Sequence, residues 1–264
     1  MSKQFFAGAL ALFALIGTSA AHAALIQNGS FETKPSDMSK FYQHAGFQYQ
    51  SRTYDQLAAS DKWGIFATLP GWNSLYGDQV ELSISGVQYD VNGQVVGFNA
   101  QDGNNFIELD THYNVVNGKI SNQSNAGISQ NLTGLKIGQS YELSFWYHSR
   151  TKAANDNTMN VFWLPTDKLP TYADFKVSTV DTTLANHSGW VEYKVKLVAT
   201  STNMTVGFGA AGDKEWKWNG LTSTNGNKTG ANLDNVSLKA IPVPATVLLL
   251  GLGLAGIALR RRNA

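Results

Sequence analysis

The chain has 264 residues, of which 15% are charged and 11% are aromatic, and it contains no cysteine. Lys3 and three terminal arginines lie in its two ends, so the part between them carries 16 basic and 19 acidic residues, a net charge of about −3. This charge argues against a basic nucleic-acid-binding surface, so we expect no nucleic-acid partner. The absence of cysteine excludes disulfides and thiol catalysis.

The first 23 residues have the layout of a signal peptide. Lys3 precedes a mostly apolar run over residues 5–16, and Ala21-His22-Ala23 offers a small-x-small cleavage site. An N-terminal membrane anchor is the alternative, but the run is shorter than the roughly 20 residues that cross a bilayer. We therefore expect residues 1–23 to be removed and the exported protein to begin at Ala24.

Residues 24–240 are predicted to form one all-β domain. Short apolar and β-branched runs lie between turn-forming dipeptides such as Asn92-Gly93, which is the pattern of a β-sandwich. In residues 191–197 every second residue is apolar, which predicts a strand with one buried face and one solvated face. Eight strands are predicted, over residues 79–85, 105–110, 128–132, 141–148, 159–164, 190–198, 204–208 and 232–239.

Two segments of this domain, residues 34–69 and 212–230, show no firm alternation of apolar and polar residues. Both are predicted to be long loops over the sandwich. Loops of this length in a compact domain are usually functional or mobile.

Several short motifs occur in an order that resembles the galactose-binding-like jelly roll, in particular an uncharacterised family shared by plant cell-wall proteins and bacterial surface proteins. The resemblance covers about residues 25–240 and implies a jelly-roll β-sandwich that binds carbohydrate. The motifs are Asn28-Gly29-Ser30-Phe31-Glu32, Leu69-Pro70-Gly71-Trp72, Val80-Glu81-Leu82, residues 104–110, residues 127–132, residues 138–147 and Leu233-Asp234-Asn235-Val236-Ser237-Leu238.

The same resemblance implies a structural calcium ion with Glu32 and Asp234 as ligands, supported by the backbone near Asn28. The first and last strands of such a sandwich can lie side by side, which would bring the two acids together. Calcium takes six to eight oxygen ligands, which carboxylates and backbone carbonyls supply. The alternative is that both acids only cap turns or pair with lysines.

Aromatic side chains in or beside loops are the candidates for sugar binding, because aromatic faces stack on the apolar side of sugar rings. The candidates are Trp63, Trp72, Tyr76, Trp216 and Trp218. Trp216 and Trp218 would point the same way on an extended segment, and Trp72 could instead anchor a strand. Three tryptophans within predicted strands are expected to fill the core: Trp146, Trp163 and Trp190.

Catalysis has weaker support in the sequence. Glu108 and Asp110 would lie about 6.5–7 Å apart on one face of a strand, a spacing formally compatible with a glycosidase carboxylate pair. Acid pairs of this kind are common in sandwich strands. The histidines show no His-Glu-x-x-His spacing, and no Gly-x-Ser-x-Gly motif occurs. We therefore expect a protein that is not an enzyme.

Residues 241–264 form a separate segment at the C-terminus. An uncharged stretch of Leu, Gly and Ala covers residues 245–259, and Arg260, Arg261 and Arg262 follow it. As a helix the stretch would be about 22 Å long, against roughly 30 Å of hydrocarbon, so it is predicted to be a marginal, transient transmembrane helix with a basic stop. Basic residues remain on the cytoplasmic side, so the domain would face outward.

This layout resembles the PEP-CTERM sorting signal of exopolysaccharide-producing Gram-negative bacteria. The glutamate of the usual Val-Pro-Glu-Pro motif is missing from Ile241-Pro242-Val243-Pro244-Ala245. The resemblance implies an exosortase-type membrane protease as partner, which removes the tail at the cell surface.

Together these features predict an exported protein of the cell envelope or extracellular matrix that binds an extracellular polysaccharide or cell-wall glycan. Two alternatives remain open. One is a structural or adhesive matrix protein without a sugar site, and the other is a secreted polysaccharide hydrolase.

Overall fold

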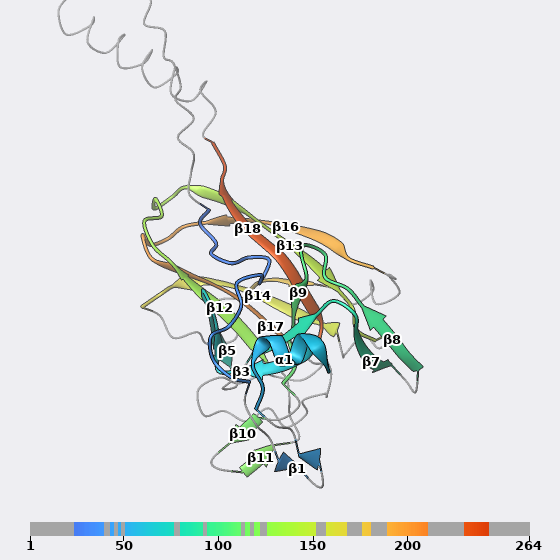
Figure 1. The fold of residues 1–264 in the computed structure, drawn as a ribbon. Coiled ribbons are helices and arrows are strands. Elements are labelled where there is room, and N and C mark those ends of the chain that lie inside the picture. Colours follow the sequence, from blue (N-terminus) through green and yellow to red (C-terminus); the bar gives the residue numbers. More distant parts are fainter. Residues whose placement is uncertain are drawn as a thin grey trace, which may run out of the picture.

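In the computed structural model, two six-stranded antiparallel sheets face each other across the main hydrophobic core (Figure 1). Successive strands cross repeatedly between the sheets, and the fold is a jelly-roll β-sandwich, as the sequence predicts. The structure describes residues 24–39, 43–44, 47–48, 51–76, 80–91, 94–111, 114–116, 119–121, 126–151, 157–167, 176–180, 189–210 and 230–242.

The first sheet has the strand order β15-β14-β17-β12-β5-β4. Three of its strands, β14, β17 and β12, are buried at most of their positions, because they form the middle of the sheet and pack on the second sheet. The bounds are β15 Lys176–Val180, β14 Met159–Pro165, β17 Met204–Ala210, β12 Gly127–Leu132, β5 Trp72–Tyr76 and β4 Thr68–Leu69.

The second sheet has the order β16-β13-β18-β9-β6-β3. The alternation predicted for residues 191–197 is confirmed: Glu192, Lys194 and Lys196 are exposed and the residues between them are buried or half-buried. The bounds are β16 Val191–Val198, β13 Ser140–His148, β18 Asn232–Ala240, β9 Asn105–Glu108, β6 Val80–Ile84 and β3 Trp63–Phe66.

Three two-stranded sheets and one helix complete the described elements. The hairpin of β7 (Val87–Val91) and β8 (Gln94–Phe98) flanks the predicted turn dipeptide Asn92-Gly93. The other elements are β1 Gln43–His44 with β2 Phe47–Gln48, β10 Asn114–Val116 with β11 Lys119–Ser121, and α1 Tyr54–Ala59.

The main core joins the two sheets through large side chains. The rings of Phe145 in β13 and Phe208 in β17 meet edge to face, with their centroids 5.0 Å apart. A second, smaller apolar cluster lies between hairpin β7–β8 and the second sheet, around Tyr89, Phe98 and Phe106. The second sheet is therefore packed on both of its faces near β9.

The prediction of one long loop over residues 34–69 is wrong in part. Helix α1, β3 and β4 lie in this segment. Thr53 begins α1 with a capping box: its side chain accepts a hydrogen bond from the Gln56 backbone, and the Gln56 side chain accepts one from the Thr53 backbone. β3 pairs with β6 and buries Phe66 completely. Elements of two to six residues are too short to give a clear apolar period.

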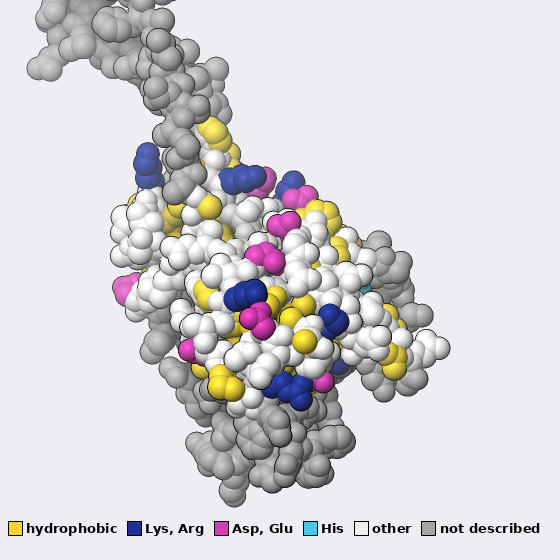
Figure 2. Space-filling model, in the orientation of Figure 1, with side chains coloured by type: hydrophobic (Ala, Val, Ile, Leu, Met, Phe, Trp, Pro, Cys, Tyr) yellow, Lys and Arg dark blue, Asp and Glu magenta, His cyan; other side chains and the backbone are white. Residues whose placement is uncertain are grey.

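Charged side chains of both signs are interspersed on the face of the molecule shown in Figure 2. Within the described ranges, no helix has the length and hydropathy needed to cross a membrane. The predicted signal peptide (residues 1–23), the predicted transmembrane helix (residues 245–259) and its basic stop (residues 260–262) lie outside the described residues.

Candidate functional site

Glu32 and Asp234, the two acids predicted to share a metal site, both bind the loop of residues 101–105. Oε1 of Glu32 accepts hydrogen bonds from two consecutive backbone N–H groups at the end of the loop, at 2.7 and 2.8 Å. Oδ2 of Asp234 accepts two from its beginning, at 2.8 and 3.0 Å. The opening segment and the last strand therefore hold this loop together.

The Asp234 carboxyl group is completely buried. Burial raises its pKa to about 7, although three backbone N–H groups oppose the shift by binding the charged form. Asp102 also raises the pKa by charge repulsion, and none of the described groups that shift this pKa is a cation. Among the described residues, Asp234 is therefore a buried acid without a compensating positive charge.

Asn28, whose backbone was predicted to support the ion, makes hydrogen bonds of its own in the opening turn. Its side-chain oxygen accepts a hydrogen bond from the backbone of Thr33, and its side-chain nitrogen donates one to Pro70. Its backbone carbonyl accepts two more, from Phe31 and from the Trp72 indole. Asn28 is thus fully engaged in fixing a turn, where its own φ of 50° is left-handed.

The described residues hold few of the side chains that a predicted calcium site would use. They include no group of three or more His, Asp or Glu side chains arranged to hold a metal ion. With Glu32 and Asp234 as two carboxylate ligands, most of the six to eight oxygens of a calcium site would have to come from backbone or water.

Trp72, predicted as a sugar-binding residue, belongs to the core instead. It is only 1% exposed, and its indole packs between Phe31 and Phe208, with ring centroids 5.5 and 6.3 Å away. Its indole N–H donates to the carbonyl of Asn28 at 2.9 Å. A sugar ring has no access to this side chain.

Of the other aromatic residues predicted to bind sugar, only Trp63 has a side chain in the described part of the structure. Tyr76 lies in β5, but its side chain is outside the described part, as are Trp216 and Trp218 entirely. Trp63 is half-buried in β3 and packs against the smaller apolar cluster. Among the tryptophans expected in the core, Trp163 is buried, whereas Trp146 and Trp190 are half-buried.

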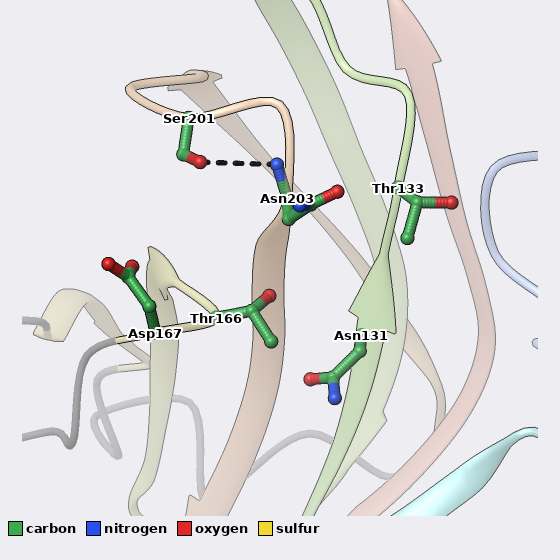
Figure 3. Close-up of a pocket in the computed structure, with 6 residues that line it drawn as sticks. All are labelled: Asn131, Thr133, Thr166, Asp167, Ser201 and Asn203. Carbon is green, nitrogen blue, oxygen red and sulfur yellow. Dashed lines mark hydrogen bonds between the residues drawn. The ribbon is translucent and has the colours of Figure 1, made fainter.

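A polar hollow of about 580 Å³ opens at one end of the first sheet (Figure 3). Its lining comes from the end of β12, from the residues after β14 and from the turn between β16 and β17. The backbone N–H of Asn203 donates to the Ser201 hydroxyl at 3.2 Å, and Thr166 N–H donates to the Asn203 carbonyl. The lining residues are Asn131, Thr133, Thr166, Asp167, Ser201 and Asn203.

A buried charged cluster occupies the other face of the second sheet, beneath hairpin β7–β8. Glu81 and Glu108 lie directly opposite each other on β6 and β9, and Asn232 lies opposite Glu108 on β18. Arg150 forms an ion pair with Glu108, and its guanidinium lies 3.9 Å from Asp110. All three carboxylates and Asn232 are completely or almost completely buried.

Tyr89 on the hairpin caps this cluster. The guanidinium of Arg150 stacks over the Tyr89 ring at 4.3 Å, and the Tyr89 hydroxyl lies 2.5 Å from that of Ser83. Burial raises the pKa of Glu81 well above its ordinary value, and repulsion from Glu108 and Asp110 raises it further. The cluster therefore holds Glu81 protonated at a pH where an exposed glutamate is charged.

Sequence reasoning identified Glu108 and Asp110 as a pair but missed Glu81 and Arg150. The available signal was Glu81 itself, an acid between apolar residues of a strand. A strand that is buried on both faces can carry an acid only with a partner. The partner Arg150 follows β13 and cannot be assigned from spacing.

The family comparison matches residues 64–222, more than half of the chain, to the family described as protein of unknown function (DUF642). The chain belongs to the DUF642 family. In this DUF642 protein, residues 240–262 also match the PEP-CTERM protein-sorting motif. The motif indicates an exported protein that an exosortase system handles. No curated protein matches the sequence.

Solved structures similar to this DUF642 protein include sugar-binding modules and parts of enzymes. A CBM35 from Paenibacillus barcinonensis is 13% identical, with 68% of this chain and 98% of that chain covered and a TM-score of 0.32. TmCBM61 in complex with beta-1,4-galactotriose is 11% identical, with 83% and 99% covered and a TM-score of 0.35.

The arabinose-bound MgGH51 α-L-arabinofuranosidase is 13% identical to this DUF642 protein, with 83% of this chain covered and a TM-score of 0.39. This DUF642 protein spans only 26% of the length of that enzyme. Identities this low concern the fold alone.

Proposed function

We propose that this exported DUF642 protein binds an extracellular polysaccharide or cell-wall glycan without cleaving it, through the polar hollow at the end of the first sheet. The observation that carries the proposal is the lining of the hollow: two amides, three hydroxyls and one carboxylate around about 580 Å³. Sugar hydroxyls both donate and accept hydrogen bonds, and amide and hydroxyl side chains do the same.

The hollow is open and polar, so a chain of sugar units can enter it without unfolding any element. None of its six lining residues is aromatic. Stacking on Trp216 and Trp218, which the sequence favours as a platform, would then form a second contact and stays a prediction. Binding through hydrogen bonds alone would be weak and would depend on several sugar units.

A non-catalytic role is part of the proposal. The side chains of Glu108 and Asp110 are almost completely buried and lie close to the Arg150 guanidinium. Hydrolysis of a glycosidic bond needs a carboxylic acid at the leaving oxygen and a second carboxylate at the sugar ring. The buried cluster presents neither group to an open surface.

The calcium ion is proposed as a structural cofactor at Glu32 and Asp234. Support comes from the geometry: the Glu32 and Asp234 carboxylates bind the two ends of the loop of residues 101–105, and Asp234 is completely buried. A bound ion stabilises the native state by mass action. The melting temperature of the protein should rise on titration with calcium and fall again with a chelator. No shift at millimolar calcium would refute the proposal.

A glycan array probed with the secreted protein tests the main proposal. Asn203→Ala and Asp167→Ala should weaken binding if the hollow is the site, whereas Trp216→Ala and Trp218→Ala should weaken it if the aromatic platform contributes. Thr33→Ala, at an exposed position outside the lining of the hollow, serves as the control.

Three outcomes would contradict parts of this proposal. Full binding by both hollow variants would place the site elsewhere. No glycan bound by the parent would favour the structural or adhesive alternative. Release of reducing sugar from an isolated exopolysaccharide would favour the hydrolase.

The proposed route to the surface has two further parts, a transient tether through residues 245–259 and removal of the tail by an exosortase-type protease. The sorting motif at residues 240–262 supports both. The masses of the protein recovered from membranes and from medium test them. Equal masses in both fractions would argue against removal of the tail.

A further inference from the structure

The chain leaves the sandwich directly at the start of the sorting motif. Strand β18 ends at Ala240, and Ile241 is still bound to β13: its N–H donates to the carbonyl of Ser140 at 2.8 Å. The side chain of Gln139 donates to the carbonyl of Ile241 at 2.5 Å. The folded domain and the motif, which begins at residue 240, therefore have no linker between them.

Exposed apolar side chains surround this point of exit. Ile137 is 68% exposed on the turn before β13, and Val198 is 46% exposed at the end of β16, opposite Ser140. The backbone N–H of Gly138 donates to the carbonyl of Ala199, which joins the two segments. We call Ile137, Val198 and Ile241 the exit end of the domain.

Three lysines lie on the elements that form the exit end. Lys239 and Lys196 flank Glu142 on the exposed face of β18, β13 and β16, and Lys136 precedes Ile137. These four residues carry a net charge of +2, whereas the part of the chain between its two ends is acidic. Figure 2 shows hydrophobic side chains at the upper end of the described part, with charged side chains of both signs beside them.

Chain length sets how far the exit end can lie from the predicted transmembrane segment. Ala245 follows Ile241 by four residues, which span at most about 14 Å when fully extended. The apolar stretch of residues 245–259 would be about 22 Å long as a helix, shorter than the roughly 30 Å of hydrocarbon. A short stretch draws its flanks toward the lipid headgroups, so the reach is reduced further.

We propose that the exit end is a membrane-contact surface, which rests on an anionic lipid bilayer while the tail is still attached. The inference rests on the tether in the proposed function. Ile137 and Val198 would enter the headgroup region, and the lysines would face the anionic lipid, which attracts basic side chains near its surface. Removal of the tail then leaves only this weak contact and releases the domain.

The absence of cysteine allows a direct test on the full chain. Ile137→Cys carries an environment-sensitive fluorophore, and Val95→Cys, which is 70% exposed on β8, is the matched control. Hairpin β7–β8 lies away from the point where the chain leaves the sandwich (Figure 1). Both proteins are bound to vesicles of phosphatidylethanolamine and phosphatidylglycerol.

The label at position 137 should shift to the emission of an apolar environment and be protected from an aqueous quencher, whereas the label at position 95 should remain accessible. Equal accessibility of the two labels on protein that floats with the vesicles would overturn the membrane contact and leave the tether standing. A chain that does not float would overturn both. Both positions are exposed, so the substitutions should not affect folding.

A second measurement separates the contribution of the lysines to membrane contact from that of the apolar residues. The Ile137→Ser, Val198→Ser double variant should lose the protection at a label placed on position 136, while raised salt should only weaken it. Protection that survives the double variant would overturn the role given to the two apolar side chains.

Discussion

Glu81 and Glu108 face each other across β6 and β9 with both side chains buried, and one arginine, Arg150, lies beside them. Two facing carboxylates cannot both be charged at low cost in such a place. Protonation of Glu81 and the ion pair of Arg150 with Glu108 together reduce the electrostatic cost of burying the two carboxyl groups. Arg150 also holds hairpin β7–β8, because its guanidinium stacks on Tyr89.

Arg150→Met should therefore destabilise the domain by about 3–5 kcal/mol, because it leaves buried carboxylates without a partner. Denaturant unfolding of parent and variant measures the difference. The exposed pair of Glu192 and Lys194 supplies the control, since Glu192→Gln should cost less than about 1 kcal/mol. A cost for Arg150→Met near that of the control would contradict a charge-compensating role.

Asp234 makes the stability of the calcium-free protein depend on pH. Its pKa is about 7 in the folded state and 3.8 as the ordinary value, so the folded state binds the proton more tightly than the unfolded state does. The resulting stabilisation is fully present below about pH 4 and is lost as the pH rises through about 7. Melting temperatures in a chelator should fall over this window, and Asp234→Asn should make the decline shallower.

Glu81 acts in the same direction, since its pKa is also raised, so the Asp234→Asn variant should keep part of the decline. The difference between parent and variant isolates Asp234. A parent and variant with parallel pH profiles would show that the Asp234 carboxyl group is charged throughout.

Much of the fold could be predicted from the sequence, because strands in a sandwich carry an apolar residue at every second position. All eight predicted strands are present within a few residues of their predicted bounds. The elements that were missed are short or depend on distant partners: β3 is only Trp63–Phe66 and is fixed by β6. A short strand gains its stability from the neighbour it pairs with, which a local pattern does not contain.

The candidate sites could be predicted from the sequence only in part. Glu32 and Asp234 could be expected near each other because the opening and closing segments of such a sandwich can be neighbours. In the structure the opening segment is not a strand, but it contacts β18 through the hydrogen bond from the Val236 N–H to the Gly29 carbonyl. The burial of Trp72 could not be predicted, since a Pro-Gly-Trp turn looks the same whether its indole points inward or outward. The hollow could not be predicted either, because common polar residues such as Asn131, Thr166 and Asn203 line it from three separate segments.

Substitutions of Trp72 test whether its side chain belongs to the core and not to a sugar-binding site. Trp72→Phe keeps an aromatic ring beside Phe31 and Phe208 but removes the hydrogen bond to Asn28, so it should cost about 1–2 kcal/mol of stability. Trp72→Ala should cost about 3–5 kcal/mol. Glycan binding per folded molecule should be unchanged in the Phe variant, and a selective loss of binding would restore Trp72 as a ligand-binding residue.

Gly29, in the opening motif, should be intolerant of any side chain. A Cβ at this position would lie 1.9 Å from the carbonyl oxygen of Val236, because the opening turn packs directly on β18. The Gly29 carbonyl also accepts the N–H of Val236 at 2.8 Å, so the two backbones cannot separate without losing that bond.

Gly29→Ala should therefore lower the free energy of unfolding by more than about 2 kcal/mol, since backbone atoms and not a flexible side chain must move. Gly97→Ala on the exposed strand β8 is the matched control, because its Cβ would meet only one atom, at 4.0 Å. The control should be neutral or slightly stabilising, as alanine orders a strand at a lower entropy cost than glycine. Similar unfolding curves for the two variants would mean that the opening turn does not pack on β18 in solution.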